Sequence, residues 1–174
     1  MLRTVHRRLG RVARSYGGGQ PLRGYLTTLT VYSGVVAALA GTAAATRRRV
    51  PERPLMGDVV LISVATHKLS RMLAKDAVTS PLRAPVTRFQ GAAGSSEVNE
   101  EPRADGKAHA AAELISCPFC LGVWVATAFS GGLVFAPRLT RLVATGLTAI
   151  AGSDFLQLAY DAAKRASGNA GAGH

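Results

Sequence analysis

The chain has 174 residues, a length typical of one domain, with 48% hydrophobic residues and a formal net charge of +11 at pH 7. Its arginines gather in blocks, and long uncharged stretches separate the blocks. This pattern argues against a basic soluble protein, whose charge is spread along the chain, and it favours membrane helices flanked by arginine. A nucleic-acid-binding protein would also be basic, but that hypothesis leaves the apolar segments unexplained, and no nucleic-acid-binding module is recognisable.

Residues 1–24 are basic and contain several glycines. They are predicted to form a flexible cytoplasmic arm that lies against anionic lipid head groups. Residues 25–46 follow without a single charge and end at three consecutive arginines. About 20 apolar residues span a bilayer, so this stretch predicts the first transmembrane helix, with a cleaved signal segment as the alternative. Its small residues would let a neighbouring helix, in a homo-oligomer for example, approach closely.

Residues 55–75 are apolar in the first half and basic in the second. Helical spacing places the apolar and basic side chains on different faces. This predicts either a tilted spanning helix, whose basic side chains reach the interface, or a helix that lies on the membrane surface. We favour the spanning helix. Residues 77–113 are polar, hold most of the acidic residues and are predicted to form a flexible loop.

Residues 114–136 and 139–161 are predicted to form the third and fourth spans, followed by a disordered low-complexity tail, residues 162–174. No strand alternation is convincing. The predicted fold is therefore all-α: a multi-pass membrane bundle of about four helices within residues 25–161.

Basic residues also predict the orientation of this bundle. With the N-terminus inside, the inner segments hold 13 Lys and Arg and the outer segments hold 6. This bias favours a membrane protein with both termini in the cytoplasm, although the arginine triplet opposes it locally.

Asp154 lies within the fourth predicted span. A carboxylate at that depth is costly unless it is paired, so an ion pair with Lys68 or Arg71 is one hypothesis. The alternative is that Asp154 lies close enough to the interface to be hydrated.

The sequence Cys-Pro-Phe-Cys begins at Cys117. Proline is best tolerated in the first turn of a helix, so Ser116 or Cys117 is the expected N-cap, and a helix N-terminus lowers thiol pKa values. Three roles remain open: a redox pair, half of a zinc site, or a purely structural role. A membrane thiol oxidoreductase normally uses a second cysteine pair, which this chain lacks. Zinc needs four ligands, which His67 and His109, or the cysteines of a second chain, would complete.

Two stretches, THKLSRMLAKDAVTSPLRAPVTRF and AAELISCPFCLGVWVA, resemble the DUF1360 family of uncharacterised bacterial membrane proteins. The resemblance covers about residues 57–161. It implies that the family motif consists here of Arg71, Asp76, Pro81, Arg83, Cys117, Cys120, Gly122 and Trp124. It implies no substrate, because the family has no established activity.

The Asp76 carboxylate is predicted to bind Arg83 or Arg71 and so to direct the following loop back towards the cysteines, a structural rather than a catalytic role. No nucleophile–base pair, phosphate-binding loop or carboxylate dyad is visible. The sequence thus favours a non-enzymatic membrane protein whose thiols bind metal or stabilise the bundle, with a membrane thiol–disulfide oxidoreductase as the alternative.

Overall fold

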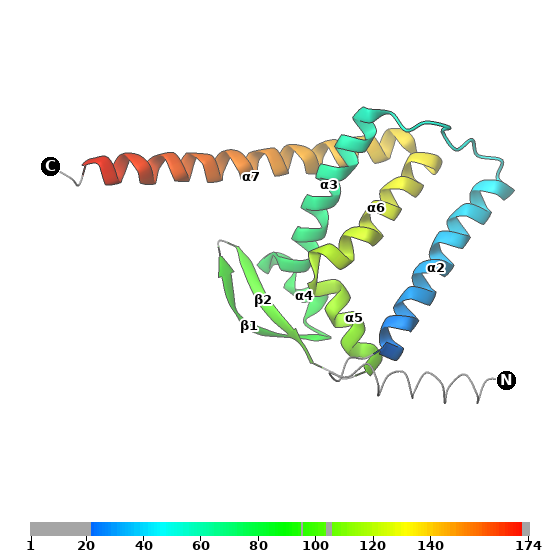
Figure 1. Ribbon diagram of the computed structural model, residues 1–174, viewed down its shortest axis with the longest axis horizontal. Coiled ribbons are helices and arrows are strands. Elements are labelled where there is room, and N and C mark those ends of the chain that lie inside the picture. The colour runs from blue at the N-terminus through cyan, green and yellow to red at the C-terminus, as the bar shows by residue number, and fades with distance from the viewer. Residues whose placement is uncertain (1–21, 95, 104–105, 172–174) are drawn as a thin grey trace.

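The structure is a computed structural model and describes residues 22–94, 96–103 and 106–171. It confirms a predominantly helical fold, in which α3 and α6 are packed side by side and α7 extends across one end of them (Figure 1). The elements in chain order are α2 (Leu22–Ala45), α3 (Met56–Lys75), η1 (Ala77–Thr79), α4 (Ser80–Arg83), β1 (Thr87–Gly94), β2 (Glu97–Pro102), α5 (Gly106–Ser116), α6 (Pro118–Phe135) and α7 (Pro137–Gly171).

The prediction of a flexible loop over residues 77–113 is wrong. That segment folds into η1, α4, an antiparallel β1–β2 hairpin and α5. The hairpin is tied to the rest of the protein because the N–H of Ala77 donates to the carbonyl of Ser96 at 2.8 Å. Two register shifts interrupt the strand pairing, and β1 reads TRFQGAAG, so the usual alternation of apolar and polar residues is missing. Non-local contacts, rather than a local pattern, therefore stabilise these strands.

Two predicted helix boundaries also need correction. The third span does not begin at residue 114, because Cys117 has extended backbone angles (φ −104°, ψ 109°) that separate α5 from α6. The fourth helix does not end at residue 161, since α7 continues to Gly171 and only residues 172–174 of the predicted tail lie outside the described residues. Most of the predicted N-terminal arm, residues 1–21, also lies outside them.

The core lies where α3 packs against α6 and α7. Its buried residues are Ala65, Val125, Phe129, Ala144 and Leu147, and Leu61, Ile62, Leu69, Met72 and Leu121 pack around them. Alanines at the contacts let the helices approach closely, which increases the number of van der Waals contacts.

Polar contacts set the register between α3 and α7. Arg141 of α7 forms two hydrogen bonds, of 2.8 and 2.7 Å, with Asp58 near the start of α3. At the other end of the contact, Lys68 Nζ lies 2.7 Å from Asp154 Oδ2. The two pairs have opposite polarity, because α3 supplies the acid in one and the base in the other. A shift of one helix past the other would therefore break both pairs.

Among the described residues, three helices are long and apolar enough to cross a membrane: α2, α6 and the part of α7 up to Ser167. The α3 helix, which carries Asp58 and the basic residues of its second half, does not meet that criterion. The number of helices compatible with a membrane span is thus three by composition alone, rather than the four predicted.

Candidate functional site

The two cysteines lie at the N-terminus of α6. Pro118 occupies the first turn, where a missing N–H costs nothing, and Cys117 is the N-cap. Its sulfur accepts a hydrogen bond from the backbone N–H of Cys120 at 3.3 Å. Both thiols are free, with Cys117 half-buried and Cys120 exposed. The N-cap assignment made from the sequence therefore agrees with the structure.

This arrangement stabilises a thiolate at Cys117. Partial burial opposes ionisation of the thiol, but hydrogen bonds from the Cys120 thiol and from the N–H groups of Cys120 and Phe119 outweigh it. The charge of Lys75 acts in the same direction. The pKa of Cys117 is consequently lowered from its ordinary value of 9.0.

Both cysteines line a pocket of about 620 Å³ between α2, α5 and the first turns of α6. Aromatic side chains form much of its wall, and the rings of Tyr32 and Trp124 meet edge to face with centroids 5.2 Å apart. The aliphatic side chains of Leu29 and Val123 extend this apolar surface.

Polar groups gather on the α5 side of the pocket. The Tyr25 hydroxyl donates to Glu113 Oε2 at 2.6 Å, and His109 Nε2 lies 3.3 Å from Glu113 Oε1. Tyr32 shares a hydrogen bond of 2.9 Å with Thr127 of α6. The hydrogen bonds of Tyr25 and Tyr32 hold α2 against α5 and α6, so the packing of these three helices forms the pocket.

The predicted metal ligands are not brought together. His109 pairs with Glu113, whereas His67 lines a separate groove near the hairpin. Across the described ranges, no group of three or more His, Cys, Asp or Glu side chains is placed to hold a metal ion. Within one copy of the chain, Cys117 and Cys120 therefore supply only two of the four ligands that zinc prefers.

The groove that holds His67 has a volume of about 630 Å³ and is lined by α3, the turn of the hairpin and α7. Lys68 and Asp154 form their ion pair here. Arg71, the other predicted partner of Asp154, instead binds Glu97 through hydrogen bonds of 2.7 and 2.8 Å. Burial raises the pKa of Asp76 at the edge of this groove, Lys68 opposes the shift, and Glu97 and Asp154 add to it.

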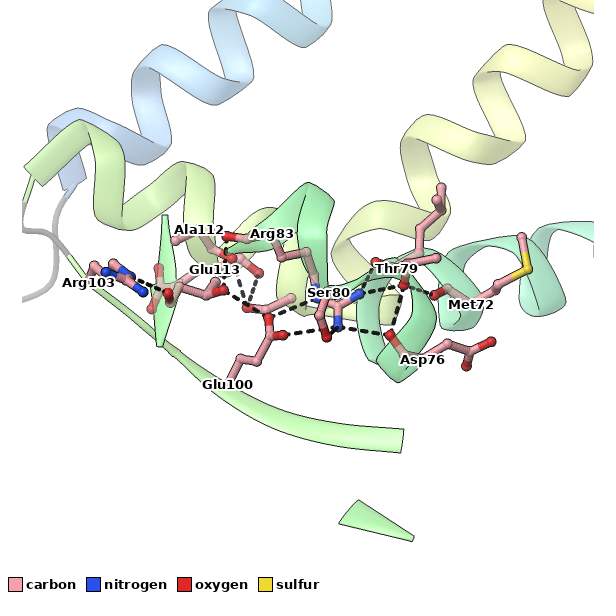
Figure 2. Close-up of polar contacts among 12 residues, drawn as sticks. Met72, Asp76, Thr79, Ser80, Arg83, Glu100, Arg103, Ala112 and Glu113 are labelled. Carbon is pink, nitrogen blue, oxygen red and sulfur yellow. Dashed lines mark hydrogen bonds and ion pairs between the residues drawn. The ribbon is translucent and has the colours of Figure 1, made fainter. Parts of the chain in front are cut away.

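Arg83 is the centre of a buried polar network at the end of α3 (Figure 2). Its side chain is 1% exposed, and its Nε lies 2.8 Å from a Glu100 side chain that is 6% exposed. The guanidinium also donates to the carbonyls of Leu73 and Asp76, at 2.6 and 3.1 Å, and so satisfies the last turn of α3. Thr79 and Ser80 accept its remaining hydrogen bonds.

Glu100 connects this network to the hairpin, because it also accepts a bond of 2.9 Å from the buried Thr87 hydroxyl. Burial alone would raise the pKa of Glu100, but the hydrogen bonds from Arg83 and Thr87 outweigh burial and lower it below 4.5. The network therefore holds an ionised carboxylate in the protein interior.

The predicted partner of the two arginines is wrong. In Figure 2 the Asp76 carboxylate points away from Arg83, which bonds the backbone carbonyl of Asp76 instead. The acidic partners are Glu97 and Glu100, which lie in the segment predicted to be a flexible loop. The sequence indicated these partners only through the concentration of acidic residues in the segment 77–113, which follows Arg71 and contains Arg83.

The three remaining motif residues, Pro81, Gly122 and Trp124, lie in helices that shape the network, the helix packing and the pocket. Pro81 lies in the first turn of α4, which delivers Arg83 to its network. Gly122 faces Ser70 and Thr66 of α3, where α3 and α6 pack together. Trp124 contributes a wall of the thiol pocket.

The family model described as "Protein of unknown function (DUF1360)" matches residues 61–160, more than half of the chain. The chain belongs to the DUF1360 family. The DUF1360 match contains the thiols, the Arg83 network and the Lys68–Asp154 pair, whereas α2 and Asp58 precede it. No curated protein and no solved structure matches the chain.

Proposed function

We propose that this DUF1360 protein is an integral membrane protein of the bacterial inner membrane, and that Cys117 and Cys120 form a thiol–disulfide site at the membrane surface. The observation that carries the thiol site is the N-cap geometry of Cys117, whose sulfur accepts the Cys120 N–H at 3.3 Å beside a second free thiol. Paired thiols at a helix N-terminus are suited to disulfide exchange, because the terminus stabilises the attacking thiolate.

The membrane location is supported by the outer surfaces of the long helices. Large apolar side chains are exposed all along α2 and α7: Leu26, Leu29, Val31, Val35 and Val36, and Leu139, Leu142, Val143, Ile150, Phe155, Leu156 and Leu158. A soluble monomer rarely exposes apolar surface on this scale, whereas lipid tails cover it without cost.

We further propose that α3 crosses the membrane as a fourth span, with both termini in the cytoplasm. Its charges are compatible with this position because Asp58 is paired with Arg141 and Lys68 with Asp154. The proposal requires α7, which extends across one end of α3 and α6, to cross the bilayer as well (Figure 1). Four spans then return the chain to the side on which it started, and the excess of basic residues on the N-terminal side favours the cytoplasm for that side.

The exchange step is a displacement at sulfur. The Cys117 thiolate attacks a disulfide of a partner protein, and one partner sulfur leaves as a thiolate that takes up a proton. The Cys120 sulfur, after losing its proton, then displaces the second partner sulfur. The result is one disulfide between Cys117 and Cys120 and two thiols on the partner, so that two electrons and two protons have moved to the partner.

Redox trapping tests this proposal. Cells are quenched in acid, and free thiols are labelled with a maleimide that adds mass. The wild-type protein should move between a doubly labelled form after reductant and an unlabelled form after a disulfide oxidant, and Cys117→Ser and Cys120→Ser should each keep a single label. A pair that stays doubly labelled under oxidant would refute the exchange function.

Zinc is the competing occupant of the same thiols. Because the described residues of one chain bring only these two ligands together, a zinc site built from them needs the cysteines of a second copy. Metal analysis of protein purified in detergent separates the hypotheses: one zinc ion per two chains, lost in Cys117→Ser, would favour a shared metal site over the thiol–disulfide site.

A further inference from the structure

The pocket beside the thiols is lined largely by apolar and aromatic side chains, which disulfide exchange with a partner protein does not require. We propose that it receives the ring of a lipid-soluble quinone, which accepts two electrons from Cys117 and Cys120. This inference rests on the proposed thiol–disulfide function and sets its direction. The dithiol of a partner protein reduces the Cys117–Cys120 disulfide, which is the reverse of the exchange step, and the quinone is the acceptor that oxidises the pair again.

The walls of the pocket suit a flat, apolar ring. Tyr32 and Trp124 stand at an interplanar angle of 71°, so that their rings form two adjoining walls. Leu29 and Val123 add aliphatic surface. A volume of about 620 Å³ lies within the range of roughly 300–1,000 Å³ that small-molecule sites occupy.

The position of the pocket favours a ligand that arrives from lipid. Two of its walls come from α2 and α6, both of which are long and apolar enough to cross a membrane. Leu29 and Val123 are 59% and 52% exposed, so the apolar wall continues onto the outer surface of these helices. A hydrophobic ring can therefore reach the thiols without passing through water.

The pocket also places the reacting groups together. Both cysteines line it, and so does Glu113, whose carboxylate contacts Tyr25 and His109. In the reaction two S–H bonds break and one S–S bond forms. The two electrons and two protons pass to the two carbonyl oxygens of the quinone, which becomes a quinol. Glu113 is placed to accept and pass on one of these protons.

This acceptor also explains how a single cysteine pair can turn over. The dithiol of a partner protein reduces the Cys117–Cys120 disulfide, and the quinone then oxidises the pair again. The exposed side of the site faces the partner, since Cys120 is exposed and the neighbouring Phe119 is 89% exposed. A second pair within the chain is not needed, because the quinone reaches the first pair directly.

The test uses the full-length reduced protein in detergent, without oxygen, and ubiquinone-1 as the probe, because its fully substituted ring resists addition of thiols. Trp124 is the only tryptophan in the chain, so its fluorescence reports on the pocket. The expected result is saturable quenching, together with one quinol formed for every two thiols lost. Cys117→Ser should still show quenching but form no quinol.

Val123→Phe fills the pocket and should weaken binding at least tenfold. Val31→Phe is the matched control, because Val31 is 53% exposed on α2 but does not line the pocket. Equal quenching in the two variants, quenching that does not saturate, or thiols that stay reduced in ubiquinone-1 would each overturn the inference.

Failure of this inference is distinguishable from failure of the exchange function. If glutathione disulfide oxidises the pair and ubiquinone-1 does not, the quinone site is refuted and the thiol–disulfide site stands. If neither oxidises it, both are refuted.

Discussion

Arg83 allows a sharp test of the network at the end of α3. Arg83→Ala removes a guanidinium that is 1% exposed and leaves the Glu100 carboxylate, 6% exposed, without its cation. It also leaves the carbonyls of Leu73 and Asp76 without their donor. Breaking a buried ion pair from one side typically costs about 3–5 kcal/mol, because the remaining charge stays in a poorly solvated position.

Arg71→Ala is the matched control, since Arg71 also forms two hydrogen bonds with one glutamate. Its side chain is 50% exposed and that of Glu97 is 21% exposed, so water replaces much of what is lost. Exposed ion pairs contribute about 0–1 kcal/mol. Both substitutions break a two-bond ion pair with one glutamate, but Arg83→Ala also removes the buried hydrogen bonds to Leu73, Asp76, Thr79 and Ser80.

Thermal unfolding in one detergent, followed by circular dichroism, measures the difference. At roughly 2–4 °C per kcal/mol for a chain of this size, Arg83→Ala should lower Tm by about 6–20 °C. Arg71→Ala should lower it by less than about 4 °C. The double variant Arg83→Met/Glu100→Leu should recover part of the loss, because it removes both charges. Equal effects of the two alanine substitutions would show that burial does not govern this network.

Three further predictions concern acid stability, thiol ionisation and helix packing. The lowered pKa of Glu100 means that its stabilising effect is complete above about pH 4.5 and is lost as the pH falls below it, so Glu100→Gln should flatten the decline of Tm in acid. Cys120→Ala should raise the apparent pKa of Cys117, measured from the pH dependence of its alkylation rate, because the thiol donor is lost. Cys120→Ser retains a hydroxyl donor and should change that pKa less. Identical pH profiles of alkylation in the two variants would exclude the side-chain hydrogen bond. A Cβ at Gly132 would lie 2.5 Å from the hydroxyl of Thr140 in α7, so Gly132→Ala should lower the free energy of unfolding by about 1–3 kcal/mol. Gly146 has open space around it, so Gly146→Ala should leave that free energy unchanged or raise it by up to about 1 kcal/mol.

The sequence by itself determined the long helices and the start of α6. An uncharged stretch long enough to span a bilayer is a local property, and so is the preference of proline for the first turn after Cys117. The sequence alone also sufficed to detect the resemblance to the DUF1360 family, because the motif residues lie in two continuous stretches within the matched range.

Only the tertiary structure decided which charges pair. Lys68, rather than Arg71, meets Asp154, and both arginines of the motif bind glutamates from a segment without strand or helix periodicity. The strands that carry those glutamates depend on contacts with the end of α3, and a pattern search along the chain does not detect such contacts. The thiol pocket is hidden for the same reason, since α2, α5 and α6 each supply a wall and none contains the pocket alone.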